Sequence, residues 1–406
     1  MKKLLLLIVL ILICTSFIFN GFSSKKEEPL KFASWGSLNE VEIINKLIKD
    51  YEEENNTKVE FLHIPQNYFQ KIHLLFASNL EPDVVFINNQ NAKLYIEANL
   101  LEDLTPYFKE AENKYYKQAL DCFKKGNKLY AIPRDISNLV LYVNKDILKK
   151  QNVEYKRKIN TLDELLELAT KLTTNEHYGV NYETNPLFWS YYLCANGGGI
   201  ISDNEKEVLI NKKESLDAIN FYTNLAHKHH VAPTKAEIGS LTTAQMFING
   251  KLAMFLSGRW LMPKFKETLN FDWDIIEFPS SEENRVYIDS SAWAISKNSK
   301  KKEEAINFIK YISSSNATEE FAKSGLIIPA RKEIAEDYLK FNKNEKPNNE
   351  DIFIEMLKYT KPTPINKNHN KINDIINEKM EAVLNAEKDA TSVFDNKTIK
   401  KLEGLL

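Results

Sequence analysis

Four tryptophans are the residues of this sequence whose type and position point most clearly to a ligand. Trp35 and Trp260 follow predicted strands, Trp189 lies in the first turn of a predicted helix, and Trp293 lies beside a predicted crossing between lobes. Flat aromatic rings cover the apolar faces of sugar rings, while amides and carboxylates bond their hydroxyl edges. The pattern favours a ring-shaped, polar solute. Trp273 lies inside a strand-like segment, and we assign it to packing.

Three polar loops follow three predicted strands and supply the amides. Strands at 30–35, 59–64 and 83–87 alternate with helices at 38–51 and 68–78, the first of which Asn39 and Glu42 would cap. This order predicts parallel strands with right-handed crossovers, and ligands bind outside the carboxyl ends of such strands. The loops at that edge are Trp35-Gly36-Ser37, Pro65-Gln66-Asn67 and Asn88-Asn89-Gln90. None of these three loops carries an ionisable side chain. The surface that they form therefore suits a neutral solute and offers few groups that could transfer a proton.

Catalytic and metal-binding signatures are absent from the sequence. It contains no Gly-x-Ser-x-Gly, His-Glu-x-x-His, phosphate-binding glycine loop or Cys-x-x-Cys motif. His227, His229 and His230 fall at the end of a predicted helix, where a cation is favourable and where their spacing points them apart. Gly197-Gly198-Gly199 follows a helix, so it is either a plain helix stop or a place where backbone approaches a ligand. We therefore predict neither a metal nor a cofactor.

Arginine is scarce, and three of its five positions fall in segments expected to face the cleft. These are Arg134, Arg259 and Arg331; a surface ion pair is the alternative for each. Asp135 is the one acidic side chain expected in the cleft.

Length and charge bound the fold and the partner class. The chain has 406 residues, with 54 basic and 56 acidic side chains and a net charge of −2, which offers no basic field for nucleic acid. Hydrophobic residues make up 43%, and a single core stops growing near about 250–300 residues, so two lobes are expected. Further strands are predicted at 139–144, 178–182, 252–257 and 292–296, and helices at 161–172, 186–195, 216–227, 242–249, 302–314 and 317–324. Residues 332–406 read as mostly helical, and without a Gly/Ser-rich linker the lobes must be joined by crossing strands.

The amino terminus reads as an export signal, residues 1–24. Met1-Lys2-Lys3 precedes an apolar run at 4–19 that is shorter than the ~20 residues of a membrane span. Gly21-Phe22-Ser23 fits a cleavage site, whereas Cys14 is a candidate for lipidation although no small residue precedes it. Cleavage, lipidation and an uncleaved anchor stay open; each places the protein in the periplasm or on the outer face of the cytoplasmic membrane. Cys122 and Cys194 read as two buried or half-buried thiols, although a single pair is not excluded.

Four blocks of sequence, in order, carry a resemblance to a known family. They are residues 82–86 with 95–104, residues 126–133 with 141–146, residues 247–260, and residues 294–299 with 306–312 and 329–332. Through these blocks the chain resembles family 1 of the extracellular solute-binding proteins of bacterial ABC importers, the group that contains the maltose-binding proteins.

The resemblance implies an α/β periplasmic-binding-protein fold of the second type, two α/β lobes with mixed sheets around a central cleft. The first lobe would comprise residues 29–136 plus 289–329, and the second 138–287 plus 331–406. Crossings would fall near 136–139, 287–291 and 328–331.

The family's ligand contacts carry over by matched position. The first lobe would supply Trp35, Gly36, Ser37, Gln66, Asn89 and Gln90, and the second Trp189, Asn196, Gly197 and Trp260. Asp135, Ser290, Ser291, Trp293 and Arg331 lie near the crossings. Gln90-Asn91 replaces a charged pair that maltose binders carry, so the resemblance supports a sugar as a class rather than maltodextrin.

The implied function is capture of a solute by lobe closure and its delivery to the transmembrane subunits of an ABC permease, by a monomer that is not an enzyme. One alternative is an exported glycoside hydrolase, which needs two carboxylates roughly 5–10 Å apart. The others are binders of peptides, or of glycerol phosphates and polyols, in which Arg259 or Arg331 would hold the anion.

Overall fold

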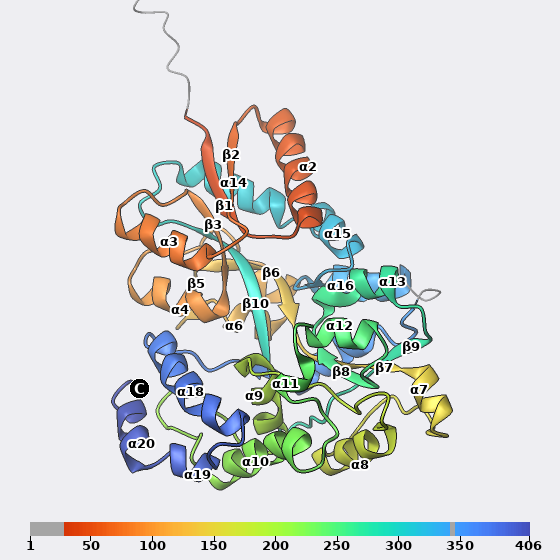
Figure 1. The fold of residues 1–406 in the computed structure, drawn as a ribbon. Helices are drawn as coiled ribbons and strands as arrows, with labels where there is room; N and C mark the ends of the chain where they lie inside the picture. Colours follow the sequence, from red (N-terminus) through yellow and green to blue (C-terminus); the bar gives the residue numbers. More distant parts are fainter. Residues whose placement is uncertain (1–27, 342–345) are drawn as a thin grey trace, which may run out of the picture.

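The computed structural model describes residues 28–341 and 346–406 (Figure 1). The expected signal at 1–24, including Cys14, lies outside the described residues. Within the described ranges, none of the helices has the length and apolar character needed to cross a membrane.

The upper lobe of Figure 1 is built on a seven-stranded mixed sheet. Its main path runs β11 (Ile328–Pro329), β6 (Ala131–Ser137), β10 (Val286–Ile295), β3 (Val84–Asn88), β1 (Leu30–Ser34) and β2 (Val59–His63), and β12 (Thr360–Pro362) pairs with β10. β2, β1 and β3 are parallel, as the sequence predicts, whereas β10 runs antiparallel to β3 and β6. Val84 to Ile87 are fully buried, because helices cover both faces of the sheet.

The helices of the upper lobe include those predicted between its strands. They are α2 (Leu38–Asn55), α3 (Tyr68–Ala77), α4 (Asn89–Glu97), α5 (Ala111–Lys114), α6 (Lys117–Asp121), α14 (Lys302–Ile312) and α15 (Ser315–Lys323), with a small hairpin of β4 (Lys124–Lys125) and β5 (Lys128–Leu129). The predicted cap of α2 by Asn39 and Glu42 is wrong. Ser37 has the extended backbone of an N-cap, and it forms a reciprocal capping box with Glu40.

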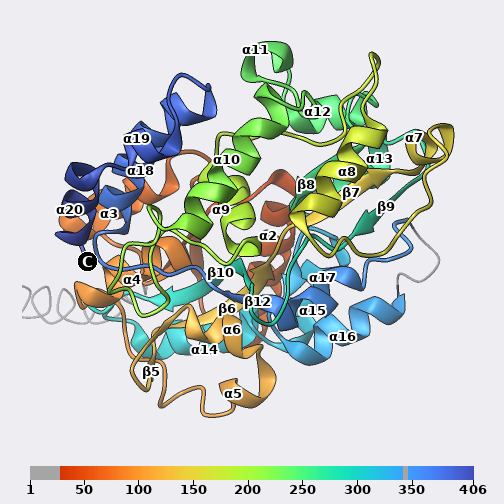
Figure 2. The same ribbon diagram turned by 90° about the horizontal axis from the view of Figure 1, so that it is seen from below.

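The lower lobe holds a three-stranded antiparallel sheet of β8 (Met254–Ser257), β7 (Val140–Asn144) and β9 (Trp273–Ile276). Around it lie α7 (Lys145–Lys150), α8 (Leu162–Leu172), α9 (Pro186–Ala195), α10 (Lys213–His227), α11 (Lys235–Ile238), α12 (Thr243–Ile248), η1 (Arg259–Leu261) and α13 (Met262–Thr268). The C-terminal part adds α16 (Lys332–Phe341), α17 (Ile352–Glu355), η2 (Met356–Tyr359), α18 (His369–Leu384), α19 (Ala390–Val393) and α20 (Asn396–Glu403). Figure 2 shows α18, α19 and α20 on the side of α9 and α10 that faces away from this sheet.

The predicted strand at 178–182 forms only one bridge, between Tyr178 and Leu252. The reason is the side chain of Asn181, whose Oδ1 accepts the Leu256 N–H at 2.7 Å and whose Nδ2 donates to the Leu256 carbonyl at 3.3 Å. The amide side chain thus takes the hydrogen bonds that a neighbouring strand would supply.

The chain passes between the two sheets within two residues. β6 ends at Ser137 in the large sheet and β7 begins at Val140 in the small one. The Leu139 N–H donates to the Tyr191 hydroxyl at 2.8 Å, and that hydroxyl donates to the Tyr287 carbonyl at 2.6 Å. A crossing near 136–139 is therefore observed, while the lobe limits 29–136 plus 289–329 and 138–287 plus 331–406 stay a prediction.

The two cysteines of the described residues are free thiols. Cys194 is buried and Cys122 is half-buried, in agreement with the sequence-based interpretation. Burial raises the pKa of both thiols, which keeps them protonated and unreactive.

Replacing Gly179 with alanine tests how closely this segment packs on α8. A Cβ at that position would lie 2.2 Å from the Ala169 carbonyl oxygen, which is backbone and cannot rotate away. We expect Gly179→Ala to lower the free energy of unfolding by about 2 kcal/mol in urea denaturation. Gly404→Ala is the control, because its Cβ would lie 3.5 Å from the Lys400 carbonyl oxygen, an ordinary van der Waals distance. Equal effects of the two substitutions would contradict this packing.

Candidate functional site

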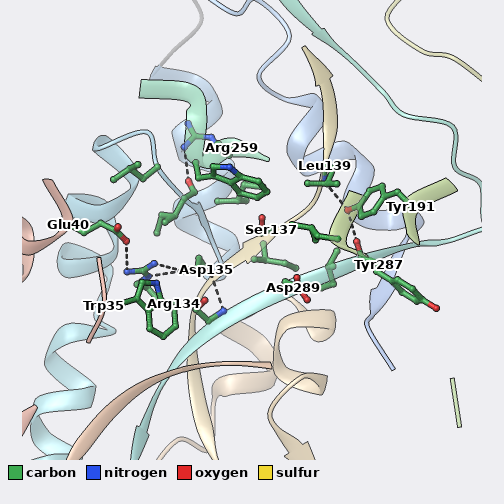
Figure 3. A pocket seen from close by; sticks show the side chains of 18 residues that line it. Trp35, Glu40, Arg134, Asp135, Ser137, Leu139, Tyr191, Arg259, Tyr287 and Asp289 are labelled. Atoms are coloured by element: carbon green, nitrogen blue, oxygen red, sulfur yellow. Dashed lines mark hydrogen bonds and ion pairs between the residues drawn. The ribbon is translucent and has the colours of Figure 1, made fainter. Parts of the chain in front are cut away.

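A cavity of about 270 Å³ lies where the chain crosses between the two sheets, and both lobes contribute to its wall (Figure 3). The upper lobe supplies Trp35, Glu40, Arg134, Asp135, Asp289 and Ser291, and the lower lobe supplies Leu187, Tyr191, Arg259 and Trp260. The cavity is therefore placed at the carboxyl edge of the parallel strands, as the sequence predicts.

Arg134 organises the upper wall of this cavity. Its guanidinium contacts Glu40 at 3.1 Å and Asp135 at 2.7 Å, and it stacks 4.3 Å from the centre of the Phe86 ring. Only 6% of the Arg134 side chain is exposed, so both ion pairs are shielded from water. Burial raises the pKa of the Asp135 carboxyl, and the neighbouring Arg134 charge opposes that shift.

Glu40 joins this network to the loop that carries Trp35. One of its carboxylate oxygens accepts the Ser37 N–H at 2.9 Å, and the other accepts from Arg134. The carboxylate thus caps α2 and also holds the start of that helix against β6. The Ser37 end of the loop Trp35-Gly36-Ser37 is fixed as a result.

Asp289 supplies a second carboxyl to the cavity; it is half-buried and lies on β10. It accepts from the side-chain amides of Asn89 at 3.0 Å and Gln90 at 3.2 Å, and from the Thr363 hydroxyl at 3.3 Å. No lysine or arginine of the described residues pairs with it. Burial raises the pKa of this carboxyl, and its three hydrogen bonds oppose the shift.

Ionisable side chains line the cavity from outside the three loops, as expected for Arg134 and Asp135. The three loops carry none, but Glu40, Arg134 and Asp289 enter the cavity from α2, β6 and β10. β10 runs antiparallel to β3, with Ser291 opposite Asn88, so its early residues meet the carboxyl ends of the parallel strands. Asp135 was expected in the cleft, whereas Glu40 and Asp289 were not. Their positions carried a signal: Glu40 lies three residues after the N-cap Ser37, and Asp289 lies in the segment 287–291 where a crossing was expected.

The tryptophans divide between cavity and core. Trp35 and Trp260 line the cavity. Trp189 and Trp293 have no exposed surface, and Trp293 packs 4.3 Å from the Phe86 ring, so the structure places both in the core and not in the cavity wall. Trp273 is also core, as predicted.

Trp260 owes its position to Gly258. The indole is 38% exposed and folds back over the backbone of that glycine. A Cβ on residue 258 would lie 1.8 Å from the indole carbon Cζ3, so any other residue would push the ring away.

The remaining predicted site residues lie at varied distances from the cavity. Ser291 lines it, and its N–H donates to Asp135 at 3.1 Å. Ser290 is buried and donates its hydroxyl hydrogen to the Asp135 carbonyl, and its N–H donates to Asn89. Gly36, Ser37, Gln66, Asn196 and Gly197 are not part of its wall; Gln66, Ser37, Asn196 and Gly197 are exposed, and Gly36 is half-buried.

The glycine run after α9 packs on α10. The Ser215 hydroxyl bonds both the N–H and the carbonyl of Gly199, and a Cβ on Gly198 would lie 2.6 Å from that hydroxyl oxygen. This contact matches the helix-stop interpretation.

The guanidinium groups of Arg259 and Arg331 are both occupied by other protein groups. Arg259 donates to the carbonyls of Gly325 and Ile327 and pairs with Glu350. Arg331 is occupied by the Ser313 carbonyl, the Ser315 hydroxyl and Glu333, outside the cavity.

The histidines at the end of α10 show no metal-site geometry. The His227 ring contacts the Leu384 carbonyl at 2.9 Å. Within residues 28–341 and 346–406, no group of three histidine, cysteine or acidic side chains is arranged to hold a metal ion.

Arg134→Ala tests the central ion pairs. Removing the guanidinium leaves two shielded carboxylates without a cation, so we expect the free energy of unfolding to fall by about 3 kcal/mol at pH 7. Arg134→Lys should restore only part of it, because an ammonium cannot copy the planar fork. Urea denaturation measures the loss, and exposed Arg285 supplies the control, for which Arg285→Ala should change stability by less than about 0.5 kcal/mol. A similar loss for Arg134→Ala and Arg285→Ala would refute the network's role.

The sequence is similar to proteins of a known family. Residues 46–349 match the family model described as bacterial extracellular solute-binding protein. A galactooligosaccharide-binding protein of Bacillus subtilis is 20% identical over 334 residues, which cover 79% of this chain and 76% of the relative.

Solved structures agree on the fold. An ABC substrate-binding protein of Listeria monocytogenes, in complex with cycloalternan, superimposes with a TM-score of 0.81 and 28% identity, covering 93% of this chain and 97% of that one. A Mycobacterium tuberculosis protein in complex with glycerophosphocholine reaches a TM-score of 0.80 at 17% identity, covering 93% and 98% of the two chains. The expected α/β periplasmic-binding-protein fold of the second type is confirmed.

Proposed function

This chain belongs to the bacterial extracellular solute-binding proteins, and we propose that it captures a sugar or oligosaccharide outside the cytoplasm for an ABC permease. The relatives whose names state a ligand support the sugar class: they bind galactooligosaccharides, maltodextrin and arabinooligosaccharides. Export by the signal at 1–24, with or without lipidation at Cys14, and action as a monomer are parts of the same proposal.

The observation that carries the proposal is the pairing of exposed indole with carboxylate acceptors in one cavity. Trp260 presents ring surface from the lower lobe, and Trp35 presents it from the upper lobe. Asp289 and Asp135 offer carboxylate oxygens, which accept strong hydrogen bonds from sugar hydroxyls. A pyranose has both kinds of surface, so this wall matches it on faces and edges.

Ligand capture then follows from the placement of these groups on two lobes. A solute that bonds Asp289 above and stacks on Trp260 below makes its full set of contacts only when the lobes are close. It therefore shifts the population toward the closed form, which the permease would recognise. Micromolar affinity, about −8 kcal/mol, lies within reach of several such contacts.

An anionic solute suits this cavity poorly. Arg134 faces two carboxylates, Arg259 is bonded to carbonyls and Glu350, and Asp289 has no cation among the described residues. The remaining charge of the wall is negative. This disfavours glycerol phosphates, although a glycerophosphocholine complex shares the fold.

A binding screen by thermal unfolding tests the proposal. We expect mono- and oligosaccharides to raise the melting temperature of the exported protein, since a ligand at 100 times its Kd stabilises the native state by about 2.7 kcal/mol. Glycerol phosphates, polyols and short peptides form the comparison sets. A shift by one of those sets alone would overturn the sugar assignment, and release of sugar products over many turnovers would establish the hydrolase instead.

Trp260→Ala tests the indole directly. Loss of the stacked ring should weaken binding of the sugar found in the screen by about 2 kcal/mol, near 30-fold, with the urea midpoint unchanged. Calorimetric titration measures the affinity. Tyr107→Ala removes another exposed aromatic ring, outside this cavity, and should leave affinity as it is. Full affinity in Trp260→Ala would remove this residue from the site.

A further inference from the structure

A separate cavity of about 510 Å³, called the upper-lobe cavity below, shares no lining residue with the cavity between the lobes. Its wall comes from the segment that leads into α5, from the junction of α14 and α15, and from Arg331 just before α16. A backbone bridge between Tyr115 and Arg331 joins two of these segments. The wall needs no residue of the lower lobe, so the cavity is the same whether the lobes are open or closed.

The wall of the upper-lobe cavity is positively charged, although the net charge of the chain is −2. It carries one carboxylate, that of Glu110, and four cations, which are Lys109, Lys114, Lys310 and Arg331. Lys114 pairs with Glu110 at 2.5 Å, and Arg331 pairs with Glu333 at 2.8 Å. Lys109 and Lys310 have no carboxylate partner among the described residues. These two charges are uncompensated, and a concave wall concentrates their field on a ligand.

Arg331 is held in this wall by contacts that leave part of its guanidinium unused. Its Nη1 donates to the Ser313 carbonyl at 3.1 Å, and its Nη2 donates to the Ser315 hydroxyl at 2.9 Å and to Glu333 at 2.8 Å. The residue is 9% exposed, and its Nε has no hydrogen-bond partner among the described residues. A guanidinium carries more N–H donors than these contacts use, so a fixed cation with spare donors borders the cavity.

The start of α15 adds to the positive character. The helix begins at Ser315, after Ser314, whose side chain caps it. The first turn of a helix carries a partial positive charge and N–H groups without helical partners, which favours anions. The end of α14 lies next to it, but the Ser313 carbonyl already accepts from the Tyr115 hydroxyl at 3.3 Å and from Arg331. Its negative charge is therefore compensated.

We propose that the upper-lobe cavity binds the phosphate group of a phosphate ester. A phosphate monoester carries about −1.5 to −2 charges at pH 7 and three acceptor oxygens, which suits two unpaired lysines and a fixed guanidinium. The volume lies within the roughly 300–1,000 Å³ of usual ligand pockets, which leaves room for the organic part. Pro106 and the 44% exposed Tyr107 offer apolar surface to it. The inference does not depend on the proposed function.

Calorimetric titration of the exported protein with phenyl phosphate tests the site. The ionic strength is held constant with sodium chloride, so that general screening of charge does not change during the titration. We expect saturable binding of one molecule per chain. Absence of binding would overturn the inference and would leave sugar binding untouched.

The double variant Lys109→Gln/Lys310→Gln removes the two unpaired charges. Both side chains are exposed, so the urea midpoint and the affinity for sugar should stay unchanged. Phenyl phosphate should bind at least about tenfold more weakly, because two charge-assisted contacts are lost. The matched control Lys71→Gln/Lys149→Gln removes the same charge from exposed positions outside both cavities and should change nothing. An equal loss in the two double variants would refute the site.

Two further measurements locate the phosphate and identify what carries it. Saturation with the sugar found in the screen should leave the affinity for phenyl phosphate unchanged. Competition between the two would place the anion between the lobes and overturn the inference. Co-sedimentation with phosphatidylglycerol vesicles, lost in Lys109→Gln/Lys310→Gln, would support the site with a lipid headgroup as the source of phosphate. Binding of phenyl phosphate without co-sedimentation would support it with a soluble ester as the source.

Discussion

One buried guanidinium fixes the upper wall of the site. Arg134 neutralises Glu40 and Asp135 while its flat face covers the ring of Phe86. Burying two carboxylates near each other is unfavourable unless a cation and hydrogen bonds compensate for the lost water, and this side chain supplies both. Because Glu40 also caps α2, the same charge sets the direction in which the first helix leaves the sheet. The Trp35 loop and the crossing strand β6 thereby keep a fixed relation.

The second determinant is the antiparallel strand β10. It carries Asp289 and Ser291 to the edge where the parallel strands end, beside the amides of Asn89 and Gln90. Those amides, predicted to bind solute directly, donate to a carboxylate that pairs with no lysine or arginine in the described part of the chain. The wall therefore favours ligands that donate hydrogen bonds over ligands that carry negative charge. The aromatic surface of Trp260 across the cavity adds a preference for ligands that contain rings. A sugar satisfies both conditions with one molecule.

Local signals in the sequence were sufficient for most elements. The period of apolar residues and the capping residues located α8, α9 and β1 to within a residue, because these elements depend on neighbours in the chain. The failures have long-range causes. Residues 178–182 satisfy their backbone through Asn181, and β12 is a three-residue strand ending in proline that exists only because β10 lies next to it.

The candidate site shows the same division. Trp35 and Trp260, which line the cavity, were predicted from their positions just after strands, whereas Asp135 and Ser291 were implied by the family resemblance, near the crossings. Trp189 and Trp293 carry the same residue type near the same edge, yet both point into the interior. The face a side chain takes depends on the register of its strand or helix against distant partners. Asp289 was not predicted, because it reaches the cavity only when β10 runs antiparallel to β3. That strand direction depends on long-range pairing and cannot be read from the local sequence.

The contacts of the Arg259 side chain join two segments that lie far apart in the sequence. Arg259 follows β8 of the small sheet. Its guanidinium donates hydrogen bonds to the carbonyls of Gly325 and Ile327 and forms an ion pair with Glu350. Only 3% of the Arg259 surface contacts solvent, so exchanging these hydrogen bonds for water is unfavourable. Arg259 therefore ties the turn ahead of β11 to the lower lobe, while β11 itself is hydrogen-bonded to β6 of the upper lobe. In the proposed closure, the backbone between Ile327 and the first paired residue, Ile328, together with β10, would take up the rotation of one lobe against the other on this side.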